Sequence, residues 1–226
     1  MANVELMNDI LKVAGVLPIL ASAEKQDAVP AAKALAAGGV PIVEVLLRSE
    51  DAMGNLHRIA KDAPEIIVGA GTVVTLRQAE EAVDHGAQFI VMPGFGRPVV
   101  EFCLKQNIPV IPGCVTPAEL TTAVEYGLTV VKFFPVYELS GLGMLNHFSG
   151  TFPSIQYVVT GALNESNFLP LMENPNVLAA GGDWMYTQRQ ALERRDWEQV
   201  ARNLRESVIQ VQDLHNAMAI ERGKVR

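Results

Sequence analysis

Eight short apolar runs that alternate with helix-like segments predict an α/β fold, a closed (β/α)8 TIM barrel. Each run and the segment after it have together the length of one strand, one helix and two tight loops. The runs are nearly continuous in apolar residues, as strands are when a parallel sheet is buried on both faces. An open doubly wound sheet is the alternative, but it rarely uses eight evenly spaced units. The segment Gly69-Ala70-Gly71-Thr72 also lacks the third glycine of a dinucleotide-binding fingerprint.

The expected elements follow one another without a linker, so residues 1–226 are interpreted as one barrel domain. Apolar residues at helical spacing predict a capping helix over residues 3–13. The apolar runs place strands at 16–20, 41–47, 65–69, 88–92, 108–112, 129–134, 156–160 and 176–180. Helices are expected between them at 27–37, 51–62, 76–85, 98–106, 117–126, 142–148 and 165–173. Several of these helices have a capping side chain at or near their start: Asp27, Ser49, Thr75, Thr116 and Asn164.

Residues 187–226 are interpreted as a C-terminal helical extension of two helices. Asp196 is a suitable N-cap for the second helix. Apolar residues recur on one face of that helix and predict the side that packs on the barrel: Trp197, Val200, Leu204, Val208, Val211 and Leu214.

The composition argues against several classes of partner. A net charge of −7, without a basic run, argues against nucleic acid. Glu5 and Asp9 interrupt the apolar pattern of the N-terminus, which therefore lacks a signal-peptide core, and no stretch approaches the length of a membrane span. Cys103 and Cys114 fit a reducing cytoplasm better than a disulfide framework. The four histidines lack metal-site spacing, so no metal or other cofactor is expected.

One charged residue, Lys132, lies inside the apolar run at 129–134. A buried ammonium group is costly, and burial favours the neutral amine. A neutral amine can attack a carbonyl carbon and form a Schiff base, which makes Lys132 a candidate nucleophile. The alternative is a lysine whose head reaches solvent at the strand end or pairs with a carboxylate.

The carboxyl ends of the strands carry the chemistry in barrels of this kind. Glu44 lies inside the second apolar run, on the same strand face as residues 46 and 48. Glu44 and Lys132 form a candidate pair of proton shuttle and nucleophile. Arg48 and Thr72 would supply hydrogen-bond donors for a small carboxylate. The alternative is a Glu44–Lys132 ion pair that merely satisfies two buried charges.

The motifs VEVLLR, VGAGTV, MPG, IPG, VKFFP, VTGA and GGDW, in this order, resemble the bacterial 2-keto-3-deoxy-6-phosphogluconate (KDPG) aldolase family. That family also includes the 4-hydroxy-2-oxoglutarate aldolases. The resemblance runs from about residue 16 to residue 197. It implies a class I aldolase that cleaves a 2-keto-3-deoxy acid to pyruvate and an aldehyde without a metal ion, and it implies a homotrimer.

Carried over by position, the resemblance makes Lys132 the residue that forms the Schiff base. It makes Glu44 the acid/base for dehydration of the carbinolamine and for the C4 hydroxyl, through a water molecule. The residues that it implies for binding the pyruvyl part are Arg48 and Thr72 at the carboxylate, with Pro93 and Phe134 around the methyl end.

This chain departs from the family pattern at several places near the expected site. Ala162 ends a segment that is TGG in the family, and Val136 follows Pro135 in place of the alanine of FFPA. Leu46 replaces a threonine, and Asp183 stands where the family pattern GGSW has serine. A carboxylate at that position is expected to act as a helix N-cap and to occupy the cradle for a distal phosphate. Two unit charges about 4 Å apart cost roughly 4 kcal/mol at an effective dielectric constant near 20.

The hypothesis is therefore that aldolase chemistry is retained while preference for a phosphorylated substrate is reduced. The alternative is that Asp183 turns outward and phosphate still binds to the backbone of Gly161, Ala162 and Gly182. Two further functions stay open at this point. One is a sugar-phosphate isomerase or epimerase with Glu44 as base, and the other is a catalytically silent barrel that binds a keto acid.

Overall fold

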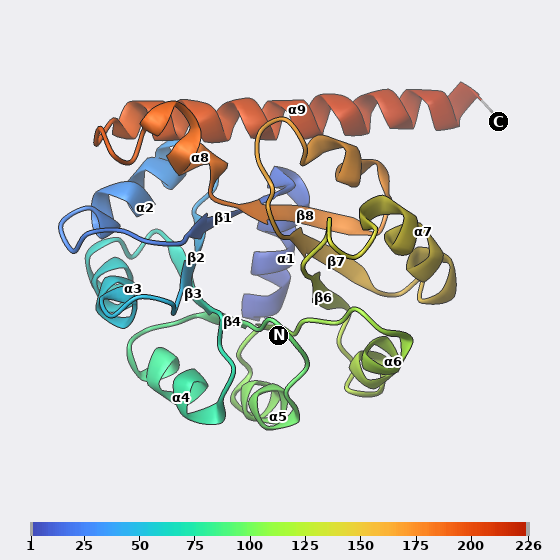
Figure 1. Cartoon of the computed structure of the whole chain (residues 1–226), viewed down its shortest axis with the longest axis horizontal. Coiled ribbons are helices and arrows are strands. Elements are labelled where there is room, and N and C mark those ends of the chain that lie inside the picture. Colours follow the sequence, from blue (N-terminus) through green and yellow to red (C-terminus); the bar gives the residue numbers. More distant parts are fainter. Residues whose placement is uncertain (1, 225–226) are drawn as a thin grey trace.

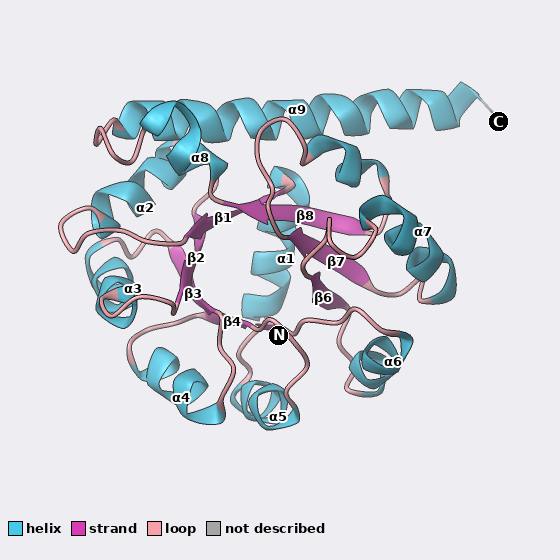
Figure 2. Ribbon diagram, viewed as in Figure 1, coloured by secondary structure: helices cyan, strands magenta, loops and turns pink. Residues whose placement is uncertain are grey.

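The computed structural model describes residues 2–224, and these form the (β/α)8 barrel that the sequence predicts (Figures 1 and 2). Eight parallel strands lie in the order β5-β4-β3-β2-β1-β8-β7-β6. The strands are β1 (Val16–Leu20), β2 (Ile42–Leu46), β3 (Ile67–Gly71), β4 (Phe89–Val91), β5 (Val110–Ile111), β6 (Val130–Phe133), β7 (Gln156–Thr160) and β8 (Val177–Gly182).

The barrel closes between β5 and β6, next to the lysine that the sequence analysis singled out. Lys132 N–H donates a hydrogen bond to Pro112 O at 2.8 Å, and Cys114 N–H donates to Lys132 O at 2.9 Å. Gly113 and Lys132 form the single parallel bridge that joins these two strands among the described residues. Both backbone polar groups of Lys132 are therefore held by the closure of the barrel.

Helices surround the strands on the outside, and α1 crosses one end of the barrel (Figure 1). The α-helices are α1 (Ala2–Ala14), α2 (Ala28–Ala37), α3 (Ala52–Asp62), α4 (Leu76–Asp84), α5 (Arg97–Gln106), α6 (Pro117–Glu125), α7 (Gly141–Thr151), α8 (Trp184–Thr187) and α9 (Trp197–Lys224). The capping helix, the eight strands and the first six inter-strand helices agree with the predicted positions to within a few residues.

Two capping predictions are confirmed in detail, and three are wrong. Thr75 and Thr116 each form a capping box, in which the threonine side chain accepts from the third N–H of the helix. Ser49 does not cap α3, because Asp51 occupies the N-cap position. Asp27 stands at the N-cap of α2, but its carboxylate instead accepts a hydrogen bond from Arg195 Nε at 2.7 Å. Asn164 precedes no α-helix at all.

The predicted helix at 165–173 is wrong, because this segment contains only a short 3-10 helix, η1 (Leu169–Glu173). The side chain of Asn164 accepts from the N–H of Ser166 at 2.9 Å, which stabilises a turn in place of a helix start. Pro170 then restricts the backbone near the start of the 3-10 helix.

The first of the two helices predicted in the extension is also wrong. After the one-turn helix α8 the chain forms only a 3-10 turn, η2 (Gln188–Gln190). Arg189 and Arg195 adopt positive φ angles of 58° and 53°, which interrupt any helix there. The second helix is confirmed as α9, and Asp196 Oδ1 accepts from Gln199 N–H at 2.9 Å, as an N-cap does.

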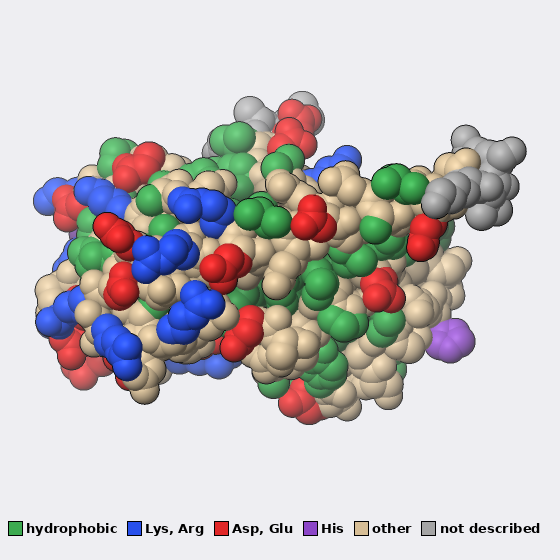
Figure 3. Space-filling model, turned by 90° about the horizontal axis from the view of Figure 1, so that it is seen from above, with side chains coloured by type: hydrophobic (Ala, Val, Ile, Leu, Met, Phe, Trp, Pro, Cys, Tyr) green, Lys and Arg blue, Asp and Glu red, His purple; other side chains and the backbone are tan. Residues whose placement is uncertain are grey.

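Helix α9 lies along the barrel beside α2, and its predicted apolar face packs on the core (Figure 1). Val200, Leu204 and Val211 are buried there. Seen from that side, basic and acidic side chains are interspersed over α2 and the first half of α9 (Figure 3). Exposed ion pairs such as Arg202–Glu198 are worth little stability, so the apolar contacts hold α9 in place.

None of the helices within residues 2–224 is both long enough and apolar enough to cross a membrane. In the same part of the chain, no three histidine, cysteine, aspartate or glutamate side chains gather in a way that could hold a metal ion.

Candidate active site

The side chain of Lys132 projects into the barrel because its strand neighbours face outward. Phe133 packs edge-on against Tyr157 and Phe148, with ring centroids 6.3 and 6.2 Å away, in the layer between the strands and α7. Successive side chains of a strand point to opposite faces, so Lys132 faces the lumen. The residue is only 5% exposed.

The Lys132 amine contacts the carboxylate of Glu44, which comes from β2 on the other side of the lumen. Nζ lies 3.3 Å from Oε1, and Glu44 is fully buried. The other carboxylate oxygen, Oε2, has no hydrogen-bond partner among the described residues. Buried polar atoms are normally hydrogen-bonded, so Oε2 is free to accept from a water molecule or a bound ligand.

A glycine on the neighbouring strand makes room for the Glu44 carboxylate. A Cβ atom at position 71 would lie 2.1 Å from Glu44 Oε1 and 2.6 Å from its Cγ. No side chain other than hydrogen therefore fits at Gly71 while Glu44 keeps its position against Lys132.

We expect Gly71→Ala to lower kcat/KM for the cleavage reaction that the family resemblance implies by about 100-fold, because displacement of a catalytic group by about 1 Å costs on that order. Gly150→Ala is the matched control, since a Cβ there meets nothing within 4 Å. Steady-state kinetics of both variants, with circular dichroism to verify folding, measure the effect. A folded Gly71→Ala variant within threefold of the unsubstituted enzyme would contradict the expectation.

Arg48 and Thr72 lie together at the carboxyl ends of β2 and β3. Arg48 Nε donates a hydrogen bond to Thr72 Oγ1 at 3.0 Å. Thr72 has a positive φ of 61°, so the turn after β3 holds its side chain in a defined place beside Arg48. Arg48 is exposed, which leaves its other guanidinium N–H groups available to an anion.

One cavity of about 250 Å³ contains most of the predicted site residues. Its walls come from the carboxyl ends of β1, β2, β6, β7 and β8. The lining residues are Ile19, Ala21, Leu46, Arg48, Lys132, Phe134, Thr160, Gly161, Ala162, Leu163, Gly181, Gly182 and Asp183. The volume is slightly below the roughly 300–1,000 Å³ that is usual for drug-sized ligands, so the cavity suits a small metabolite.

Three predicted site residues are not in the wall of this cavity. Glu44 contacts the wall residue Lys132, and Thr72 contacts the wall residue Arg48. Pro93 packs against the loop after β5, where a Cβ on Gly113 would lie 2.2 Å from its carbonyl oxygen. Phe134 does line the cavity, and its ring centroid lies 5.5 Å from Lys132 Nζ.

Thr160 is a wall residue that the sequence analysis did not select. It is 3% exposed, and its hydroxyl has no hydrogen-bond partner in the described part of the chain. A Cβ at position 181 would lie 2.7 Å from its methyl carbon, so Gly181 allows Thr160 to pack there. Its place as the last residue of β7 was the signal that could have found it.

Asp183 follows β8 at the N-cap position of α8, but it does not cap that helix. The structure gives its side chain no capping hydrogen bond, which corrects the prediction that this carboxylate acts as an N-cap. The side chain is half-buried and belongs to the cavity wall. Burial raises the pKa of the Asp183 carboxyl above its ordinary value, and a hydrogen bond to its own backbone opposes this in part.

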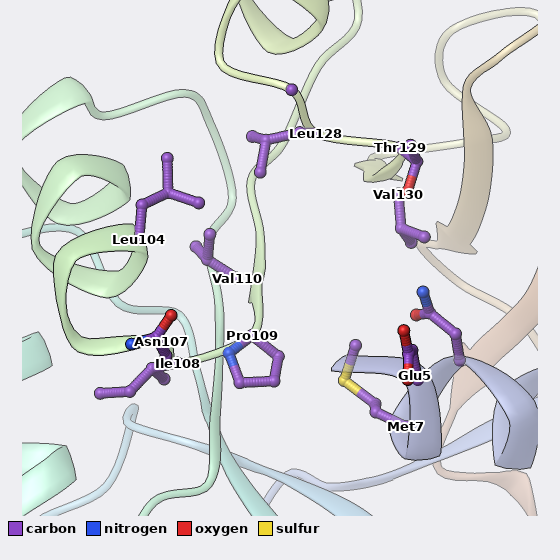
Figure 4. Close-up of a pocket in the computed structure, with 12 residues that line it drawn as sticks. Glu5, Met7, Leu104, Asn107, Ile108, Pro109, Val110, Leu128, Thr129 and Val130 are labelled. Atoms are coloured by element: carbon purple, nitrogen blue, oxygen red, sulfur yellow. The ribbon is translucent and has the colours of Figure 1, made fainter. Parts of the chain in front are cut away.

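A second cavity, of about 280 Å³, lies at the opposite end of the barrel (Figure 4). It is bounded by Glu5 and Met7 of α1 and by the segments 107–110 and 127–130, which enter β5 and β6. Its walls are mainly apolar and hold no pair of opposite charges. This second cavity therefore lacks the amine and guanidinium groups that line the cavity at the carboxyl end of the strands.

One protein family and several known proteins are similar to this chain. The model of the KDPG and KHG aldolase family matches residues 7–203. The KHG/KDPG aldolase of Escherichia coli K12 is 38% identical over 199 residues, which cover 88% of this chain and 93% of that protein. The 2-dehydro-3-deoxy-phosphogluconate aldolase of Treponema pallidum is 38% identical over 185 residues, covering 82% and 88% of the two chains.

A solved structure with similar architecture is that of the KDPG aldolase of Legionella pneumophila, with pyruvate captured as a covalent carbinolamine intermediate. Its sequence is 32% identical, its TM-score is 0.83, and the match covers 88% of this chain and 97% of that one. The match of the family model over most of the barrel and these identities establish the relationship. This chain therefore belongs to the KDPG and KHG aldolase family and is an aldolase, a carbon–carbon lyase.

Proposed function

We propose that this chain is a class I aldolase that cleaves a 2-keto-3-deoxy acid to pyruvate and an aldehyde through a Schiff base on Lys132. The contact between the buried Glu44 carboxylate and the amine of Lys132, which lines the cavity at the carboxyl end of the barrel, carries this proposal. The covalent pyruvate adduct of the Legionella relative supports the same chemistry. The substrate is a small keto acid.

Formation of the Schiff base begins with a proton transfer within the pair. The Lys132 ammonium gives a proton to Glu44 across the 3.3 Å contact, and the neutral amine attacks the C2 carbonyl carbon of the substrate. The carbonyl π electrons move to oxygen, which takes a proton from the newly attached nitrogen and gives a neutral carbinolamine. Loss of the C2 hydroxyl as water, with a proton supplied by Glu44, leaves a protonated imine.

Cleavage then uses the protonated imine as an electron sink. Glu44, through a water molecule at its free Oε2, accepts the proton of the C4 hydroxyl, and the C3–C4 bond breaks. The bonding pair forms the C2–C3 double bond of an enamine, while the imine π electrons move to nitrogen. The aldehyde leaves, the enamine is protonated at C3, and water hydrolyses the imine to pyruvate and the free lysine.

Arg48 and Thr72 hold the substrate carboxylate at the same end of the barrel. Arg48 offers guanidinium N–H donors in the planar geometry that matches a carboxylate, and its bond to Thr72 at 3.0 Å fixes its direction. Phe134 packs beside the reacting carbons, and the family resemblance assigns Pro93, in the loop after β4, to the methyl end of the pyruvyl part. The wall residues Gly161, Ala162, Gly182 and Asp183 are left for the aldehyde end of the substrate.

Borohydride trapping tests the proposal. With pyruvate alone, reduction should convert the imine into a stable secondary amine, and mass spectrometry of the digested protein should place the adduct on Lys132. The same sample without borohydride should exchange the methyl protons of pyruvate in D2O, because the enamine is protonated at C3. An isomerase, or a barrel that only binds a keto acid, would show neither result, and that outcome would refute the aldolase mechanism.

We further propose that copies of the chain associate as a homotrimer in a reducing cytoplasm. Several large apolar side chains are exposed on one set of outer helices and loops, and association would cover them: Val74, Leu76, Leu104 and Val124. The number three comes from the family resemblance. Both cysteines are free and buried, in keeping with a reducing compartment.

A further inference from the structure

The charged groups in the wall of the active-site cavity come from three different strands or the segments directly after them. The cationic groups, Lys132 and Arg48, come from β6 and from the segment directly after β2. The one carboxylate in the wall among the described residues, Asp183, follows β8, next to the turn at Gly161 and Ala162 after β7. A keto acid bound to Lys132 with its carboxylate at Arg48 leaves the part of the wall formed by β7 and β8 for its far carbons. Asp183 lies in this part, the aldehyde end of the cavity.

Among the described residues, the Asp183 carboxylate has no ion-pair or hydrogen-bond partner outside its own residue. Within residues 2–224 it forms no ion pair, and it does not cap α8. It is half-buried in the wall, so water only partly solvates it. A hydroxyl group that donates a hydrogen bond to this partly desolvated carboxylate is therefore bound favourably. An anion that approaches the carboxylate is repelled more strongly than it would be in water.

The neighbouring groups at this end are neutral and polar. The Thr160 hydroxyl is buried without a partner and lies in the same wall. In the turn after β7, Gly161 and Ala162 have positive φ angles of 119° and 50°, and Asn167 Nδ2 donates a hydrogen bond to Ala162 O at 3.0 Å. This end of the cavity therefore presents hydroxyl and carboxylate oxygens at defined positions, without a lysine or arginine in its wall.

We propose that the aldehyde end of the substrate is an uncharged polyhydroxylated chain whose hydroxyl groups donate hydrogen bonds to Asp183. The inference rests on the aldolase function proposed above and specifies its substrate class. Substrates whose far end carries a phosphate or a carboxylate are then poor substrates, since both groups bring an anion close to Asp183. Asp183 is then the residue that sets specificity at the far end, while Lys132 and Glu44 perform the same chemistry on every substrate.

The opposing possibility is that backbone N–H groups bind an anion in spite of Asp183. The N–H groups of Gly161, Ala162 and Leu163 take part in none of the turn and loop backbone hydrogen bonds, and such groups can bind phosphate. They would do so only if the carboxylate moved away or became protonated. Substitution of Asp183 separates the two cases.

The experiment compares kcat/KM for 2-keto-3-deoxygluconate, its 6-phosphate and 4-hydroxy-2-oxoglutarate. We expect the unsubstituted enzyme to prefer the neutral chain. Asp183→Asn keeps the shape of the side chain and removes its charge, and Asp183→Ser also removes the charge. Each substitution should raise the ratio of kcat/KM for the anionic substrates to kcat/KM for the neutral one by at least about tenfold, a change of about 1.4 kcal/mol. Asp62→Ser, at an exposed aspartate that ends α3, is the control and should leave the ratio unchanged.

Exchange of the pyruvate methyl protons in D2O is measured on the unsubstituted enzyme, because it needs no aldehyde. If exchange is absent, the aldolase proposal fails. If exchange occurs but the enzyme prefers the 6-phosphate, or both Asp183 variants keep the original ratio, the inference about the far end is overturned and the aldolase proposal stands.

Discussion

Replacing Lys132 by methionine is expected to lower kcat/KM for aldol cleavage by roughly 10⁴- to 10⁶-fold, the loss typical when a covalent nucleophile is removed. Methionine has a similar length and is unbranched, so it fills the space of the lysine stem without offering an amine. Borohydride with pyruvate should no longer label the protein, and pyruvate release, coupled to lactate dehydrogenase, should fall to the background rate.

The substitution also leaves the Glu44 carboxylate buried without its partner, and breaking a buried ion pair typically costs about 3–5 kcal/mol. Thermal unfolding must therefore accompany the kinetics. The double variant Lys132→Met with Glu44→Gln removes both charges and should recover most of the stability without recovering activity. Lys25→Met, which removes an exposed lysine paired with Asp51, is the control and should behave as the unsubstituted enzyme. Substantial cleavage by a folded Lys132→Met variant would exclude the Schiff-base mechanism.

Replacing Glu44 by glutamine is expected to lower kcat by roughly 10²- to 10⁴-fold, the range that general acid–base catalysis contributes. Glutamine keeps the shape that packs against Gly71 but cannot take the proton of the Lys132 ammonium or of the C4 hydroxyl. Because Lys132 remains, pyruvate in long incubations with borohydride should still label it. Exchange of the pyruvate methyl protons should slow together with cleavage.

The retained label distinguishes this result from loss of the nucleophile. Glu198→Gln, at an exposed glutamate that pairs with Arg202 within α9, should leave all rates unchanged. A Glu44→Gln variant with kcat within fivefold of the original value would show that Glu44 only neutralises Lys132 and that another group moves the protons. That result would restore the simple ion-pair interpretation of the two buried charges.

Local sequence rules predicted most of the barrel. They failed where a capping side chain instead bound a residue far along the chain or stabilised a local turn. Thr75 and Thr116 cap their helices because the capping box involves only residues three apart. Asp27, which has the same capping chemistry, pairs with Arg195, 168 positions away. Asn164 does not cap a helix, because its side chain accepts a hydrogen bond from Ser166 N–H and stabilises a turn. Asp183 likewise has the right residue type and position for an N-cap, yet its carboxylate forms no capping bond.

The sequence by itself determined the strand and helix periodicity, the burial of Lys132 and Glu44 in apolar runs, and the order of the strand-end motifs. These features follow from local spacing and from the cost of burying a charge. Only the tertiary structure decided that the two side chains meet at 3.3 Å, that Gly71 leaves room for Glu44, and that Thr160 and Asp183 share one wall. Lys132 and Glu44 are 88 positions apart, so closure of the barrel, and no local preference, sets the distance between their reacting atoms.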